Sequence, residues 1–130
     1  MKQDTISVVI PVLNAGNYLG QCLDSLRAQT LKPDEIVIVD DGSVDNSMIV
    51  IHDYMKNIPQ LVCLRNKTNK GISYSLNRAI EKSKSKWIMR MDADDICFKD
   101  RLETMLNFCL ENNVDVCGSQ IQYFSNSSSN

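Results

Sequence analysis

The sequence contains no long apolar run and no excess of one charge. Nowhere among its 130 residues do about 18 apolar residues follow one another, the length that a transmembrane helix needs. Met1 to Thr5 is polar, and the apolar run after it is interrupted by Pro11 and Asn14, so we expect no signal peptide. Fourteen basic and 16 acidic residues give a net charge of −2. This balance offers no electrostatic basis for a nucleic-acid partner.

The cysteines form no Cys-x-x-Cys pair. Five are present, an odd number, and they fall mostly within apolar segments: Cys22, Cys63, Cys97, Cys109 and Cys117. This usage predicts buried, reduced thiols rather than a disulfide framework or a zinc site. We therefore expect a cytoplasmic protein.

Two glycine-rich phosphate-binding motifs are also absent. Neither Gly-x-Gly-x-x-Gly nor Gly-x-x-x-x-Gly-Lys-Ser/Thr occurs, which disfavours hydride transfer and P-loop ATPase activity. A hydrophobic content of 43% and a charged content of 23% are ordinary for a globular protein, and the length suits one domain.

The segments that are present alternate between strands and helices. Apolar, β-branched runs predict strands over residues 6–13, 35–39, 61–64, 86–91 and 114–121. Helical spacing of apolar residues predicts helices over 18–29, 45–55 and 72–83, and a fourth helix after Asp100. This order predicts an α/β fold, a Rossmann-like, doubly wound and mostly parallel sheet with helices on both faces. Residues 125–130, rich in Ser and Asn, are expected to be a disordered tail.

Carboxylates follow two of the predicted strands. The strand at 86–91 ends at Asp92, Asp94 and Asp95, and another ends at Asp40 and Asp41. In an open α/β sheet, ligands bind beside the carboxyl ends of the strands. Because clustered carboxylates raise each other's pKa unless a cation compensates them, a Mg²⁺ or Mn²⁺ site is predicted. The alternative is an acidic loop that caps the following helix.

A nucleotide diphosphate with its metal fits two acidic clusters in one crevice. Asp94 or Asp92 would hold the metal, and Asp41 would accept hydrogen bonds from an imino or hydroxyl group of the base or ribose. The loop that contains Lys70 and Gly71 offers further donors. Simpler readings remain open: a turn at residues 40–43, a solvated loop at 70–71, and a solvated basic face at Arg78, Lys82, Lys84, Lys86 and Arg90.

Taken together, the motifs resemble glycosyltransferase family 2. The resemblance extends from Ile6 to about Gln120, and these segments carry it: Ser7 to Ala15, Gln29-Thr30, Glu35 to Ser43, Asn69-Lys70-Gly71, Asn77-Arg78 and Met91 to Asp95. It implies a GT-A fold that binds a nucleotide sugar, commonly a UDP-sugar with Mn²⁺ or Mg²⁺. It also implies inverting transfer to an acceptor hydroxyl, in the building of a polysaccharide.

The resemblance assigns roles to individual residues. Asp94 corresponds to the direct metal ligand of a D-x-D element, with Asp92 and Ala93 near the ribose and phosphate. Asp41 corresponds to the acid that contacts the base, and the segment lining the base pocket is Pro11, Val12 and Leu13. An aromatic residue is common where Leu13 stands, so base stacking is weakened.

No carboxylate of this chain corresponds to the general base that deprotonates the acceptor. We therefore expect residues 1–124 to form an incomplete GT-A domain that binds the donor and has no acceptor half. The acceptor implied is a glycan or glycolipid, at the inner face of the plasma membrane. Exposed apolar surface is expected to favour self-association. Two other functions stay open: a non-catalytic nucleotide-binding module and a Mg²⁺-dependent phosphatase or phosphotransfer domain.

Overall fold

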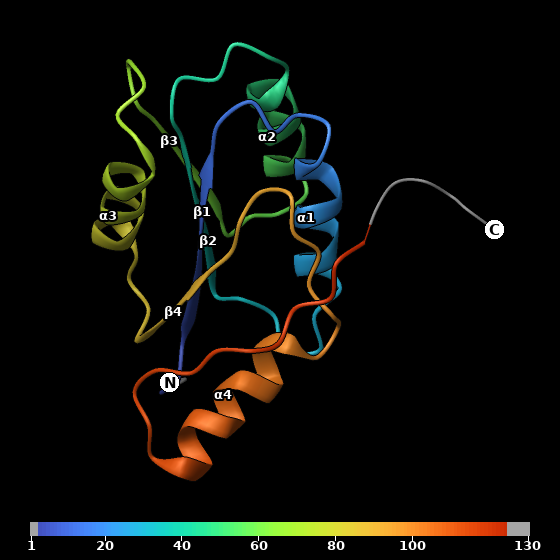
Figure 1. Cartoon of the computed structure of the whole chain (residues 1–130), viewed down its shortest axis with the longest axis vertical. Helices are drawn as coiled ribbons and strands as arrows, with labels where there is room; N and C mark the ends of the chain where they lie inside the picture. The colour runs from blue at the N-terminus through green and yellow to red at the C-terminus, as the bar shows by residue number, and fades with distance from the viewer. Residues whose placement is uncertain (1–2, 125–130) are drawn as a thin grey trace, which may run out of the picture.

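A computed structural model of the chain describes residues 3–124 and contains four strands and four helices in that range. In chain order (Figure 1) they are β1 (Ile6–Val12), α1 (Leu19–Arg27), β2 (Glu35–Asp40), α2 (Ser47–Met55), β3 (Leu61–Arg65), α3 (Ile72–Lys82), β4 (Trp87–Arg90) and α4 (Arg101–Asn112). None of these helices has the length and hydrophobicity to cross a membrane. The tail predicted at 125–130 lies outside the described residues.

The four strands form one sheet in the order β3-β2-β1-β4, and every pair is parallel. From β1 the chain moves outward to β2 and β3 and then returns to add β4 on the other side of β1. The direction of winding therefore reverses between β1 and β4, and a ligand crevice is expected beyond their carboxyl ends. The predicted α/β fold is confirmed.

Helices cover both faces of the sheet (Figure 1). On one face Val8, Ile10 and Ile38 are fully buried in a core that also contains residues of α1, α2 and α4. On the other face, Val9, Val37 and Val39 pack with Ala79 and Leu76 of α3. Because central strands with both faces covered need apolar side chains at successive positions, β1 and β2 consist mostly of Val and Ile.

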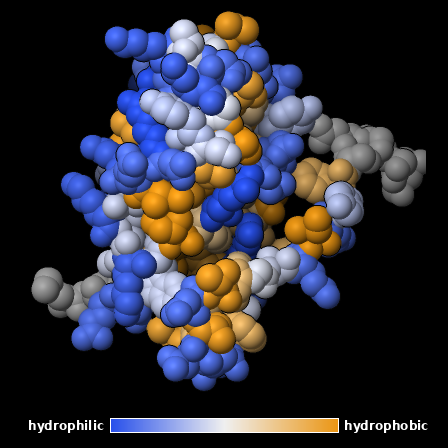
Figure 2. Space-filling model, turned by 60° about the vertical axis from the view of Figure 1, so that its left-hand side comes forward, coloured by the Kyte–Doolittle hydropathy of each residue, from blue (hydrophilic) through white to orange (hydrophobic). Residues whose placement is uncertain are grey.

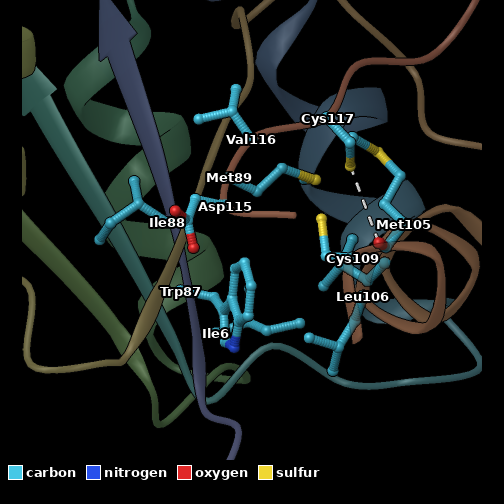
Figure 3. A pocket seen from close by; sticks show the side chains of 11 residues that line it. Ile6, Trp87, Ile88, Met89, Met105, Leu106, Cys109, Asp115, Val116 and Cys117 are labelled. Carbon is cyan, nitrogen blue, oxygen red and sulfur yellow. Dashed lines mark hydrogen bonds between the residues drawn. The ribbon is translucent and has the colours of Figure 1, made fainter. Parts of the chain in front are cut away.

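The prediction of a strand at residues 114–121 is wrong. The structure gives this segment no strand, and Val116 and Ile121 are 87% and 73% exposed. A cavity of about 170 Å³ lies between it and β4, lined from the two sides by residues such as Met89 and Cys117 (Figure 3). A strand needs a neighbour close enough for a hydrogen-bonded ladder, and at 114–121 the backbone has none within the described range.

All five cysteines are free, and Cys22, Cys97 and Cys109 are buried as the sequence analysis expects, whereas Cys63 and Cys117 are only half-buried. Burial raises the pKa of the Cys63 thiol to about 11, with the nearby charge of Asp40 adding to the rise. The Cys63 thiol is therefore protonated at neutral pH.

Some apolar side chains are exposed on the face that carries α3. Figure 2 turns this side of the molecule toward the viewer and shows apolar surface among charged residues. Ile72 and Ile80 of α3 and Ile88 of β4 are 53%, 47% and 40% exposed. The self-association expected from the sequence stays a prediction.

Replacing Ile38 with Ala should lower the free energy of unfolding by about 3 kcal/mol, because a fully buried side chain of β2 would leave a cavity. The matched control is Val44→Ala, at a position 91% exposed, which should change it by less than about 0.5 kcal/mol. Urea unfolding followed by circular dichroism measures both. Equal effects of the two substitutions would contradict this core.

Candidate functional site

A cavity of about 400 Å³ lies at the carboxyl ends of β1, β2 and β4. It is lined by eight of the residues that sequence analysis selected: Pro11, Val12, Leu13, Asp41, Gly71, Asp92, Ala93 and Asp94. Other residues of its wall include Asn14, Tyr18, Asn69 and Ser75. The fold thus gathers segments from residue 11 to residue 94 around one opening.

Asp41 is buried at the end of β2, and both of its carboxylate oxygens accept hydrogen bonds. Oδ1 accepts from Asn66 Nδ2 at 2.8 Å and from the Lys70 backbone N–H at 2.7 Å. Oδ2 accepts from the Gly71 N–H at 3.0 Å. Asp41 therefore holds the loop that follows β3 against the end of β2.

The electrostatics keep Asp41 ionised. Burial alone raises the pKa of this carboxyl, but the hydrogen bonds from Lys70, Asn66 and Gly71, with the Lys70 charge, outweigh it. The pKa of Asp41 accordingly lies below its ordinary value of 3.8. A carboxylate that accepts several N–H donors prefers its charged form.

Gly71 is required by backbone conformation. Its φ is +94°, in the region that favours glycine, and a Cβ placed there would meet nothing within 4 Å. Glycine is therefore required at position 71 by the positive φ of the turn and not by close packing of neighbouring atoms. The turn directs the Gly71 N–H to Asp41.

Asp40 and Lys70 do not line the cavity. Asp40 is fully buried, and its Oδ2 accepts from the Ser43 N–H at 3.0 Å and lies 3.3 Å from Arg65 Nε. Successive side chains at a strand end point to opposite sides, so only Asp41 of this pair faces the opening. Lys70 contributes its backbone N–H to Asp41. The structure thus gives the Asp40 carboxylate a structural position beneath the site.

Three carboxylates stand together after β4. One oxygen from each of Asp92, Asp94 and Asp95 lies within 4.8 Å of the others, and all three residues are exposed. The pKa of Asp95 is raised by burial and then by the negative charges of Asp92 and Asp94, with Arg101 opposing. A divalent cation, which takes oxygen ligands, would relieve this repulsion. The geometry adds Asp95 to the predicted pair.

The loop after β1 is tied to the loop after β2. Asn14 has φ +51°, its N–H donates to Ser43 Oγ, and its Oδ1 accepts from the Val44 N–H, both at 2.9 Å. The next N–H, of Ala15, donates to Ser47 Oγ at 3.0 Å. These bonds fix one wall of the cavity.

Sequence analysis missed a buried polar group at the base of the site. Asn66 and Ser75 are 3% and 0% exposed, and Asn66 Nδ2 donates to Ser75 Oγ at 3.0 Å. Arg78, which had been read as part of a solvated face, donates from Nη1 to Asn66 Oδ1 at 2.9 Å. A lone Asn in a polar loop carries no periodic signal that would have marked it.

The sequence model of Glycosyl transferase family 2 matches residues 7–130, nearly the whole chain. The chain belongs to this family. The resemblance to glycosyltransferase family 2 that the motifs indicated is therefore confirmed.

Relatives of this family 2 chain include the uncharacterized glycosyltransferase YibD of Escherichia coli K12. It is 40% identical over 111 residues, which cover 85% of this chain and 32% of YibD. The poly(ribitol-phosphate) beta-glucosyltransferase of Bacillus spizizenii is 36% identical over 114 residues, covering 85% of this chain and 18% of that protein. The chain thus spans a third or less of these two relatives.

The fold is similar to that of glycosyltransferases of known structure. TarS of S. aureus (residues 1–349), crystallised with UDP-GlcNAc, superposes with a TM-score of 0.77 and 27% identity, over 84% of this chain and 32% of that one. The mannosyltransferase PcManGT of Pyrobaculum calidifontis, solved with GDP-Man and Mn²⁺, has a TM-score of 0.76 over 84% of this chain and 33% of that one. Its identity of 21% shows the fold alone. The family 2 chain has the GT-A fold that sequence analysis predicted.

Replacing Asp41 with Asn should flatten the dependence of stability on acid pH. Because the folded pKa of Asp41 is lowered, its ionised form stabilises the fold above 3.8, and this stabilisation is lost as pH falls through the folded pKa. Urea unfolding is measured at several pH values from about 2 to about 7. As the pH falls, the free energy of unfolding should decrease less in Asp41→Asn than in the wild type. If the free energy of unfolding depends on pH equally in the two proteins, the hydrogen bonds do not stabilise the ionised form of Asp41.

Proposed function

We propose that this family 2 chain is the donor-binding part of an inverting, metal-dependent glycosyltransferase. The donor is a nucleotide-diphosphate sugar, a UDP-sugar, and the acceptor is a hydroxyl of a glycan or glycolipid in polysaccharide biosynthesis. The observation that carries the proposal is that Asp41 and the pair Asp92 and Asp94 open into one cavity from strands on either side of β1. We assign donor binding to residues 1–124.

The carboxylates after β4 fit a Mn²⁺ or Mg²⁺ ion. Asp94 and Asp92 would hold it, with Asp95 close enough to contribute, because their oxygens converge within 4.8 Å. When bound, the metal neutralises the negative charge that develops on the diphosphate leaving group. The pKa of Asp95 is raised first by burial and then by the charges of Asp92 and Asp94, and the second contribution is the repulsion that a bound cation would relieve.

The remaining wall of the cavity suits a nucleoside. Asp41 Oδ2 accepts one bond, from Gly71, which leaves it capacity to accept another from an imino or hydroxyl group of base or ribose. Pro11, Val12 and Leu13 offer apolar contact to the base. Leu13 is 46% exposed and so remains accessible to a ligand.

The relatives support the classes of donor and acceptor. TarS was crystallised with UDP and with UDP-GlcNAc, which favours a uridine nucleotide for this chain. The named relatives include a poly(ribitol-phosphate) glucosyltransferase and the chondroitin and hyaluronan synthases of Pasteurella multocida. Their names describe the glucosylation of a polymer and the synthesis of two polysaccharides, which favours a glycan acceptor for this chain. The free thiols favour a reducing compartment, so the proposal includes the cytoplasmic face of the membrane.

Titration calorimetry with UDP and Mn²⁺ tests the proposal. The wild type should bind UDP, and omission of Mn²⁺ or the substitution Asp94→Ala should weaken binding by about tenfold or more, since the ion links phosphate to protein. Asp53→Ala is the matched control, because it removes one carboxylate from α2, at a side chain 66% exposed, and should leave the affinity unchanged. A wild type that does not bind UDP, or an Asp94→Ala variant that binds it equally with Mn²⁺, would contradict the proposal.

A further inference from the structure

Asn66 follows β3 directly and is buried beneath the cavity. Its backbone N–H donates to Asp40 O at 2.8 Å, which continues the pairing of β3 with β2 by one residue. The side chain is thereby directed into the space between β2 and α3, where it is 3% exposed. None of the roles assigned so far uses this residue.

Every polar atom of the Asn66 side chain has a partner. Nδ2 donates to Asp41 Oδ1 and to Ser75 Oγ, and Oδ1 accepts from Arg78 Nη1. A guanidinium only donates and a carboxylate only accepts. The two charged partners therefore permit one orientation of the amide, with its nitrogen toward Asp41 and its oxygen toward Arg78.

This orientation determines which way the Asp41 carboxylate faces. Oδ1 is shared between Asn66 and the Lys70 N–H, while Oδ2 meets the Gly71 N–H. The loop at residues 67–71 is thus held to Asp41 at both ends, by the Asn66 side chain before it and by the Lys70 and Gly71 N–H groups at its end. The loop also lies close to the turn after β2, since a Cβ at Gly42 would be 3.4 Å from the Asn69 nitrogen. Asn69 and Gly71 form part of the cavity wall.

We propose that Asn66 is a positioning residue that sets the orientation of Asp41 and, through it, the closed state of the loop at 67–71 that receives the donor. The effect on the loop follows from the contacts of this chain alone. The effect on donor affinity rests on the proposed function. Asn66 does not itself line the cavity and contacts none of the proposed metal ligands; it meets the cavity wall through its hydrogen bonds to Asp41 and Ser75, so it acts on the donor site through Asp41.

The charged groups around this pair come from four segments. Arg78 faces it from α3 and Lys70 from the loop, while Arg65 of β3 forms its ion pair with Asp40 of β2. Asn66→Ala leaves these charges in place and removes one hydrogen-bond donor from Asp41. The pKa of Asp41 should then rise toward its ordinary value, because the Asn66 hydrogen bond lowers it.

The experiment compares Asn66→Ala with the matched control Asn112→Ala, which removes an exposed amide donor from α4, away from Asp41 and the cavity. Three quantities are measured on the whole chain: the titration midpoint of the Asp41 carboxyl by ¹³C NMR, native-state trypsin cleavage after Lys67 and Lys70, and the Kd for UDP with Mn²⁺. Asn66→Ala should raise the midpoint, speed cleavage by about tenfold and weaken UDP by about tenfold. Asn112→Ala should change the last two by about twofold or less, with an unchanged midpoint.

The outcomes separate this inference from the proposed function. Unchanged midpoint and cleavage in Asn66→Ala, with normal UDP binding by both variants, would overturn the positioning role and leave the function standing. A wild type that does not bind UDP, with the midpoint and cleavage shifted as expected, would overturn the function and support the positioning of the loop. If Asn66→Ala does not fold, Arg78→Ala replaces it. Loss of the guanidinium allows the Asn66 amide to rotate by about 180°, so the titration midpoint and the cleavage rate should shift in the same direction as in Asn66→Ala. Values equal to those of the wild type would overturn the inference.

Discussion

Parallel pairing of β1 with β2 on one side and β4 on the other is the constraint on which the site depends. The pairing extends past the strands themselves: the Asp41 N–H donates to Val12 O at 2.8 Å, and the Met91 N–H donates to Val9 O at 3.1 Å. Asp41 and the segment that begins at Asp92 are therefore positioned by the same strand. A shift in register at β1 would move one acidic group relative to the other, and the burial of Val8, Ile10 and Ile38 opposes such a shift.

The carboxylates at this edge of the sheet are of two physical kinds. Asp41 is buried and receives three hydrogen bonds, so the protein itself stabilises its charge. Asp92 and Asp94 are exposed and gather with Asp95, and within the described residues the one ion pair among them joins Asp92 to Arg90 at 3.4 Å, so three carboxylates face a single guanidinium at that distance and a cation can compensate the rest. One group thus suits recognition of a neutral hydrogen-bond donor, and the other suits an ion. This division is what a nucleoside at one end and a diphosphate at the other require.

Much of this arrangement could be predicted from the sequence because it depends on local pattern. The runs rich in β-branched residues indicated buried parallel strands. The spacing of Leu19, Leu23 and Leu26 indicated the helix that covers them, and all three side chains are fully buried. The position of Asp92 and Asp94 after a strand placed them at the carboxyl edge of the sheet. These predictions needed only the periods of helix and strand and the geometry of parallel sheets.

The parts that could not be predicted depend on contacts between distant segments. The sequence analysis selected Asp41 for the base or ribose, but nothing in the pattern shows that Asp40 is buried beneath the site, since that is set by the neighbouring strands and by Arg65. Residues 114–121 have strand-forming composition, but a strand exists only with a partner, which β4 does not provide across the intervening cavity. Asn66 belongs to a polar loop and becomes buried only when α3 packs against β2.

Paramagnetic broadening tests the central claim most directly, because Mn²⁺ reports the position of the ion and of the nucleotide site in one experiment. When Mn²⁺ and UDP are added to ¹⁵N-labelled protein, amide signals of residues 92–95 should broaden first, followed by those of 11–15 and Gly71, while signals of α2 stay sharp. Without UDP, the broadening should be weaker and confined to residues 92–95. Uniform broadening over the surface, or broadening that UDP leaves unchanged, would contradict a joint site for metal and nucleotide at the carboxyl ends of β1, β2 and β4.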